Sequence, residues 1–203
     1  MPDASETRVP LFPLSTVLFP GGPLPLRIFE ARYLDMVSRC MKEETEFGVL
    51  LIAEGPEVAG AASAQTFAVG TLARITDWYQ GTDGLLGITA TGTSRFRLQA
   101  VDQQADGLNL GEIERLPTDE KVPVPEEFAG WSALLEAVLD DLGKLYEGIE
   151  RDYQDANWLG YRFAEILPLE MEARQACLEM NDPIERLKFL QPLLRQVREG
   201  QIQ

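Results

Sequence analysis

A proline-rich apolar stretch near the start of the chain restricts the fold more than any other feature. Residues 9–28 hold five prolines among large apolar residues: Pro10, Pro13, Pro20, Pro23 and Pro25. Proline fixes φ and lacks a backbone donor, so it is confined to edge strands, strand starts and turns. The stretch therefore predicts two short extended segments, at 10–14 and 24–28, joined by a tight turn at 19–22.

The spacing of apolar residues changes after residue 28. Apolar side chains then recur at steps of three and four residues, as on one face of a helix: Ile28 or Phe29, Tyr33, Met36, Val37, Cys40 and Met41. The polar residues fall mainly between them and can stay in water. The sequence predicts an amphipathic helix directly after the second extended segment.

Residues 47–116 have the pattern of strands. Runs at 47–53, 67–80, 85–100 and 108–116 are separated by turn-forming residues such as Gly84 and Gly107. A polar segment at 54–65 predicts a mobile loop, and residues 1–7 a loose end. Antiparallel hairpins with one early helix predict a small closed or nearly closed β-barrel.

A boundary follows at residues 117–125, where three prolines stand among charged residues. Beyond it the apolar period is helical throughout. Apolar residues at alternating steps of three and four predict one long helix: Phe128, Trp131, Leu135, Val138, Leu142, Leu145 and Ile149. Such a helix could belong to a coiled coil or to a small bundle, and we favour the bundle. Further helices are predicted at 155–167, at 170–180 and after the N-cap Asp182, with Pro192 expected to kink or break the last one. The predicted fold is α+β, with an antiparallel barrel domain at 1–118 and a helical bundle at 119–203.

Charge and missing residue types exclude several function classes. The chain carries 33 acidic and 18 basic residues, a net charge of −15. This charge opposes binding to nucleic acid or to an anionic membrane surface, since both are bound through Lys and Arg. With no histidine, the sequence excludes Ser-His-Asp and Cys-His catalysis and histidine-ligated metals. We therefore expect no catalytic residue, no cofactor, no metal site and no membrane partner.

Several residue pairs have both a chemical and a structural interpretation. Cys40 and Cys177 lie on the apolar sides of predicted helices, which favours buried free thiols over a disulfide or a reactive thiol and indicates a cytoplasmic protein. Adjacent carboxylates such as those at 140–141 diverge by about 100° on a helix, so a solvated face is favoured over an acid–base or cation site. Arg95 and Arg97 lie on the same face of a predicted strand. We favour the interpretation that this face is simply a polar outer surface over the alternative that it recognises an acidic ligand.

Several ordered motifs resemble the Lon-protease N-terminal domain family. They are LFPL at 11–14, LFPG at 18–21, LPLRIFEARY at 24–33, FGVLLI at 47–52, VGTLARI at 69–75 and GTSRFRL at 92–98. Arg27 and Ala31 replace residues that are often histidine and proline in the family, without disturbing the apolar pattern. The resemblance implies a PUA-like barrel followed by helices. For its motif residues Glu30, Arg32 and Tyr33 we favour structural roles; on a helix, the first two would not face each other, so each would need another partner.

The resemblance also implies recognition of polypeptide rather than catalysis. Full-length Lon proteases carry ATPase and Ser-Lys protease domains after this module, and the present sequence shows neither. The expected partner is an unfolded or degradation-targeted protein, with an ATP-dependent protease as a further candidate. The alternative is an adaptor or scaffold for one folded partner. A small-molecule or RNA binder is a third hypothesis, and the negative charge opposes RNA binding. Proline-rich edges can present apolar side chains to another chain, and the candidates for this contact are Phe12, Leu14, Phe19 and Leu24.

Overall fold

The computed structural model describes residues 8–55 and 65–198. The chain forms two compact units, residues 1–118 and residues 119–203. The boundary falls inside the proline-rich segment at 117–125. The predicted loose end at 1–7 and most of the predicted loop at 54–65 lie outside the described residues.

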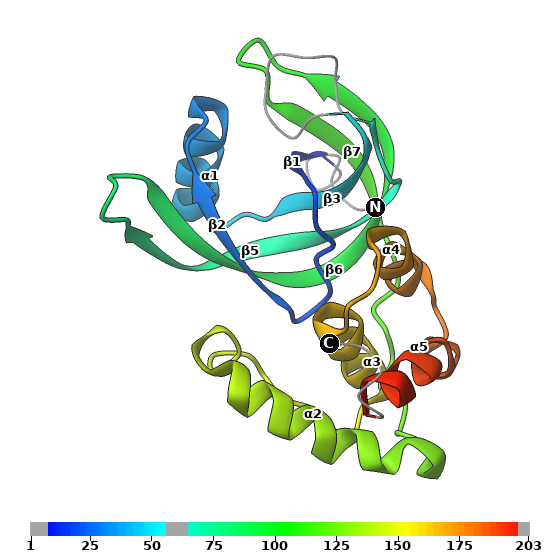
Figure 1. The fold of residues 1–203 in the computed structure, drawn as a ribbon. Helices are drawn as coiled ribbons and strands as arrows, with labels where there is room; N and C mark the ends of the chain where they lie inside the picture. The colour runs from blue at the N-terminus through cyan, green and yellow to red at the C-terminus, as the bar shows by residue number, and fades with distance from the viewer. Residues whose placement is uncertain (1–7, 56–64, 199–203) are drawn as a thin grey trace. The chain divides into compact units, whose positions relative to one another are not determined.

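The first unit is a β-barrel with one helix (Figure 1). Its elements are β1 (Arg8–Leu14), β2 (Pro23–Ile28), α1 (Ala31–Glu43), β3 (Phe47–Glu54), β4 (Gln65–Thr66), β5 (Val69–Gln80), β6 (Leu86–Gln103) and β7 (Asn109–Arg115). Hydrogen-bonded neighbours follow the order β1, β7, β6, β5, β3, and β1 also pairs with β3, which closes the ring. β2 pairs with β6, and β4 with β3, outside the ring. The predicted barrel is confirmed with one correction: the closing pair β1–β3 is parallel.

β1 changes partner halfway along its length. Its residues from Arg8 to Pro10 pair with β7, and those from Leu11 to Leu14 pair with β3. A strand segment that is paired on one edge directs every second N–H away from its partner, so a proline can stand there without losing a bond. The prolines of β1 are therefore compatible with a strand that closes the barrel.

The turn at 19–22 packs tightly against β6. The Gly21 N–H donates to the Gly92 carbonyl at 2.8 Å, and the Gly92 N–H donates to the Gly22 carbonyl at 2.9 Å. A Cβ on residue 92 would lie 2.2 Å from the Phe19 carbonyl oxygen, so glycine is needed for this approach. These contacts hold the opening segment against the middle of the longest strand.

α1 packs its apolar face on the barrel core. Tyr33, Met36, Val37 and Cys40 are buried on it, as the periodicity predicts. The Tyr33 ring stacks on Phe12, with ring centroids 3.9 Å apart. The helix ends at Glu43, and the capping residue Glu44 adopts a left-handed conformation with a φ of 55° before the chain turns into β3.

The second unit is helical (Figure 1). Its elements are the 3-10 turn η2 (Glu126–Phe128), α2 (Ala129–Leu142), the 3-10 turn η3 (Gly143–Leu145), α3 (Ala156–Ile166), α4 (Met171–Glu179) and α5 (Pro183–Arg198). The Asp182 carboxylate accepts the Ile184 N–H at 2.8 Å and so caps α5, as predicted. α5 continues through Pro192, so the helix is not broken there.

α2 is shorter than the predicted apolar seam. Gly143, with a φ of 61°, follows its last residue, and both Leu142 and Leu145 are exposed. The buried residues of α2 are Trp131, Leu135 and Leu139, which recur every four residues rather than at heptad steps. The expected long helix is therefore wrong, because Gly143 ends it with a positive φ that residues with a side chain rarely adopt.

A buried arginine links α3, α4 and α5. Arg186 donates to the Cys177 carbonyl at 2.9 Å, to the Met180 carbonyl, and to Oδ1 of Asn157 at 3.3 Å. Gly160 leaves the space that this side chain fills, since a Cβ there would lie 3.1 Å from Cδ of Arg186. The guanidinium thus supplies donors to carbonyls at the end of α4, which the helix itself cannot satisfy.

Candidate functional site

Two adjoining hollows lie on the first unit beside the C-terminal end of α1. One has a volume of about 560 Å³ and is bordered by α1, β1 and β7; the other, of about 600 Å³, is bordered by α1 and β5. Both are lined by Cys40, Glu44, Thr45 and Arg74. We call the second one the α1–β5 groove, and its lining is completed by Met41, Ile75, Thr76, Asp77 and Trp78.

β5 presents a backbone edge to the α1–β5 groove. β3 pairs with β5 only at Thr71–Ala73, whereas β6 pairs with it from Val69 to Gln80. The hairpin of β5 and β6 thus extends past the start of β3 (Figure 1). Five consecutive β5 residues, 74–78, line the groove, whereas a sheet face would present only alternate residues. The groove therefore adjoins the edge of β5, which within the described residues has no strand partner beyond Ala73 on this side.

Two large apolar side chains of the groove are exposed to solvent. Trp78 is 58% exposed and Met41 is 37% exposed. Tyr79, the next residue along β5, covers Gly87 of β6, where a Cβ would lie 2.3 Å from the tyrosine ring. Trp78 is therefore placed on the groove side and Tyr79 on the opposite face. Such an exposed aromatic side chain beside a hollow offers area that a partner can bury.

The charged groups of the groove leave a surplus of negative charge. Glu46 is shared between Arg74 at 3.5 Å and Arg115 at 3.0 Å, so its single negative charge offsets only one of these two arginines. Glu44 and Asp77 are both exposed. The Asp77 carboxylate accepts the backbone N–H of Trp78 at 2.8 Å, which gives this N–H a local acceptor in place of a strand.

The sequence-predicted apolar contact residues lie in the core instead. Phe12, Leu14, Phe19 and Leu24 are all buried, with exposed fractions between 0% and 8%. Phe12, Leu14 and Leu24 pack in the cluster that also holds the buried face of α1. The expectation that these four side chains are presented to another chain is therefore wrong for this structure. The physical reason is that α1 packs over the barrel core that these residues help to form: the Phe12 ring stacks on Tyr33 of α1, with ring centroids 3.9 Å apart.

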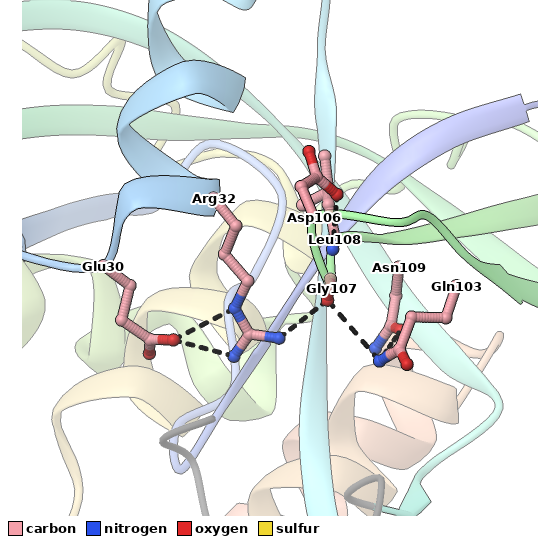
Figure 2. Close-up of polar contacts among 7 residues, drawn as sticks. All are labelled: Glu30, Arg32, Gln103, Asp106, Gly107, Leu108 and Asn109. Atoms are coloured by element: carbon pink, nitrogen blue, oxygen red, sulfur yellow. Dashed lines mark hydrogen bonds and ion pairs between the residues drawn. The ribbon is translucent and has the colours of Figure 1, made fainter. Parts of the chain in front are cut away.

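The motif residues Glu30 and Arg32 pair with each other, contrary to the expectation that each needs another partner (Figure 2). Glu30 stands before α1 as its N-cap, with extended backbone, so helical spacing does not separate the two side chains. Nε of Arg32 donates to Oε2 of Glu30 at 3.0 Å, and Nη1 donates to the Gly107 carbonyl at 2.9 Å. Gln103 donates to the same carbonyl at 3.5 Å. Arg32 thereby ties the start of α1 to the turn between β6 and β7.

The remaining chemical candidates have structural surroundings. Cys40 and Cys177 are buried free thiols, as predicted, and burial raises the pKa of both, that of Cys177 to about 11. They therefore stay protonated, and poorly nucleophilic, at neutral pH. Arg95 is buried while Arg97 is exposed, so the two do not share the solvated outer face that the alternation predicts. Among the described residues, no group of three or more acidic or cysteine side chains is placed to hold a metal ion, and no helix has the length and apolarity to cross a membrane.

Comparisons with known proteins agree on one kind of domain. Residues 8–196 match the family model described as the ATP-dependent protease La (LON) substrate-binding domain. Lon protease 2 of Myxococcus xanthus is 25% identical over 94% of this chain, and protein cereblon of Danio rerio is 30% identical over 56% of it. The chain spans about a quarter of the length of each of these relatives, 24% and 26%.

Solved structures share the fold. The Lon N-terminal domain protein from Xanthomonas campestris is 36% identical, with a TM-score of 0.75, and the match covers 92% of this chain and 98% of that one. The N-terminal domain of the Mycobacterium avium complex Lon protease is 16% identical, with a TM-score of 0.63 over 92% of this chain and 97% of that one. The second likeness concerns the fold alone.

Proposed function

Since the chain belongs to the family of substrate-binding domains of the ATP-dependent protease La (Lon), we propose that it recognises polypeptide without catalysing a reaction. Its ligands would be unfolded or degradation-targeted proteins. An ATP-dependent protease is a further candidate partner, to which such ligands could be passed. The buried free thiols suit a reducing compartment, and we place the protein in the cytoplasm.

One observation carries the choice of site. The exposed Trp78 and Met41 side chains both line the α1–β5 groove, beside a stretch of strand edge that has no strand partner among the described residues. Tryptophan residues that become desolvated at an interface often contribute 2 kcal/mol or more to binding. The apolar residues of the proline-rich segment cannot serve in this way without opening the core.

The proposal is tested by fluorescence anisotropy of a labelled, permanently unfolded polypeptide titrated with the full chain at low and high salt. Saturable binding that persists at high salt is expected, because apolar contacts are not screened. The substitution Trp78→Ser should weaken binding by about thirtyfold, which corresponds to about 2 kcal/mol. Tyr79→Ser is the matched control, because this neighbouring aromatic lies on the other face of β5.

Two results would contradict the proposal. Flat anisotropy with the native protein would favour the adaptor hypothesis, which a pull-down that returns one stoichiometric folded partner would then support. Equal loss of affinity in the Trp78 and Tyr79 variants, with both variants folded by circular dichroism, would remove the groove as the binding site.

A further inference from the structure

We infer that a polypeptide occupies the α1–β5 groove as an added β-strand on the edge of β5, and that it is an extended segment bearing apolar and basic side chains. This inference rests on the proposed function and specifies how the site works. Strand addition takes its affinity from main-chain hydrogen bonds and its selectivity from alternate side chains.

The backbone geometry supports strand addition. β3 stops pairing with β5 at Ala73, although β5 continues to Gln80 against β6. The chain before β3 leaves this line, because Glu44 adopts a left-handed conformation and Thr45 donates its N–H back to the Cys40 carbonyl at 3.0 Å. An added strand would lie beside β5 in the position that β3 would occupy if β3 started several residues earlier in the chain.

The side chains of the groove define the chemistry of the occupant. Ile75 is half-buried in the barrel core, and Trp78 and Met41 are exposed beside it, so apolar side chains can be buried there. Glu44 and Asp77 carry exposed negative charges, and Arg74, which shares Glu46 with Arg115, carries the positive charge of the lining, so the lining residues of the groove sum to a charge of −1. Charge complementarity therefore favours a lysine or arginine in the added strand.

The same charges disfavour a second copy of this chain as the occupant. Two copies that paired through their β5 edges would bring Glu44 and Asp77 of one copy close to the same residues of the other. Each copy also carries a net charge of −15. Like charges placed across an interface oppose association.

The test uses a labelled peptide of about nine residues in which valine or leucine alternates with lysine or threonine. Two versions carry N-methyl groups on alternate backbone nitrogens, one on the odd and one on the even residues. A strand that joins one sheet edge uses the N–H groups of only one parity. One methylated version should bind at least about thirtyfold more weakly than the parent peptide, and the other within about threefold of it.

A protein variant tests the charge. Glu44→Asn removes the carboxylate and places at that position a residue that tolerates the left-handed conformation. It should weaken binding of the basic peptide about threefold at low salt and leave binding of a peptide with threonine in place of lysine unchanged. An equal effect on both peptides would contradict the predicted contact with a basic side chain.

Other outcomes would overturn the inference while leaving the proposed function distinguishable. If both methylated peptides bind like the parent and Trp78→Ser still weakens binding, the groove binds polypeptide but not as a strand. If the unfolded polypeptide binds and the nine-residue peptides do not, the groove is not a strand-addition site. If the protein alone sediments as a dimer that the parent peptide dissociates, the edge belongs to a second copy.

Discussion

The substitution Gly92→Ala should open the contact between the turn at 19–22 and β6. The new Cβ would lie 2.2 Å from the Phe19 carbonyl oxygen and 3.1 Å from Cγ2 of Thr71. Relief of the first contact to an ordinary separation requires a shift of about 1 Å between two backbone segments. Such a shift breaks the hydrogen bonds of 2.8 and 2.9 Å that join residue 92 to Gly21 and Gly22.

The expected loss of stability follows from these contacts. Two backbone hydrogen bonds contribute about 0.5–1.5 kcal/mol each, and overpacking of a close contact costs about 1–3 kcal/mol. The free energy of unfolding of the barrel should therefore fall by about 3 kcal/mol. This is a large part of the stability of a typical domain.

Native-state hydrogen exchange measured by mass spectrometry can follow the two units separately. A loss of about 3 kcal/mol corresponds to exchange roughly a hundredfold faster in the fragments of β2 and β6. Gly130→Ala is the control, because this glycine lies in the first turn of α2 with nothing within 4 Å of the added Cβ. If hydrogen exchange of the barrel in the Gly92→Ala variant stays within about threefold of the native rate, the argument that the close approach requires glycine is refuted.

Three further predictions concern the polar contacts and the thiols. Arg32→Met should destabilise the barrel by about 1–2 kcal/mol, because it removes the bond to the Gly107 carbonyl, and exchange should accelerate first in the β6–β7 turn. Arg186→Met should destabilise the helical unit by about 3 kcal/mol in urea unfolding, because two buried carbonyls and an amide oxygen lose their donor; unchanged stability would contradict this. Because the pKa of the Cys177 thiol is about 11 in the folded protein and about 9 when exposed, the native state binds this proton more tightly, so the contribution of this thiol to stability should be constant up to about pH 9 and be lost between pH 9 and 11. Cys177→Ala should lessen that loss.

Local signals in the sequence were sufficient for most elements. Prolines marked the extended segments, a period of three and four residues marked α1, and Asp182 followed by Pro183 marked the start of α5. Each of these signals acts over a few residues. Such signals reflect the steric and hydrogen-bonding requirements of the element itself.

Burial in the barrel depended on pairings between distant parts of the chain. Phe12 is buried because α1 packs against it, with Tyr33 stacked on its ring, and no local pattern encodes this contact between distant residues. The contact of Glu30 with Arg32 depended on the helix beginning one residue after Glu30, within the usual uncertainty of a predicted boundary.

The groove was missed for a related reason. In the sequence, Trp78 follows Val69, Leu72 and Ile75 at steps of three, so it looks like one more apolar member of the same strand. The pairing of β5 with β6 is irregular between Thr71 and Ala73 and again between Ile75 and Asp77. Each irregularity changes the alternation of side chains, so that residues three apart can face the same side of a strand. The adjacent aromatics Trp78 and Tyr79 were a usable signal, since consecutive residues of a strand face opposite ways and one of them must leave the core.

The closure of the barrel by β1 has a consequence for the chain during its synthesis. β1 is made first among the strands and β7 last, so roughly 100 residues must be added after β1 before the ring can close. At typical synthesis rates this takes about 5–20 s. Throughout that time the apolar residues of β1 lack their final strand partner, and an unpaired strand can pair with another chain. Pro10 and Pro13 lack the backbone donors that pairing with a foreign strand would use, so we expect them to disfavour such pairing in the interval before β7 is made.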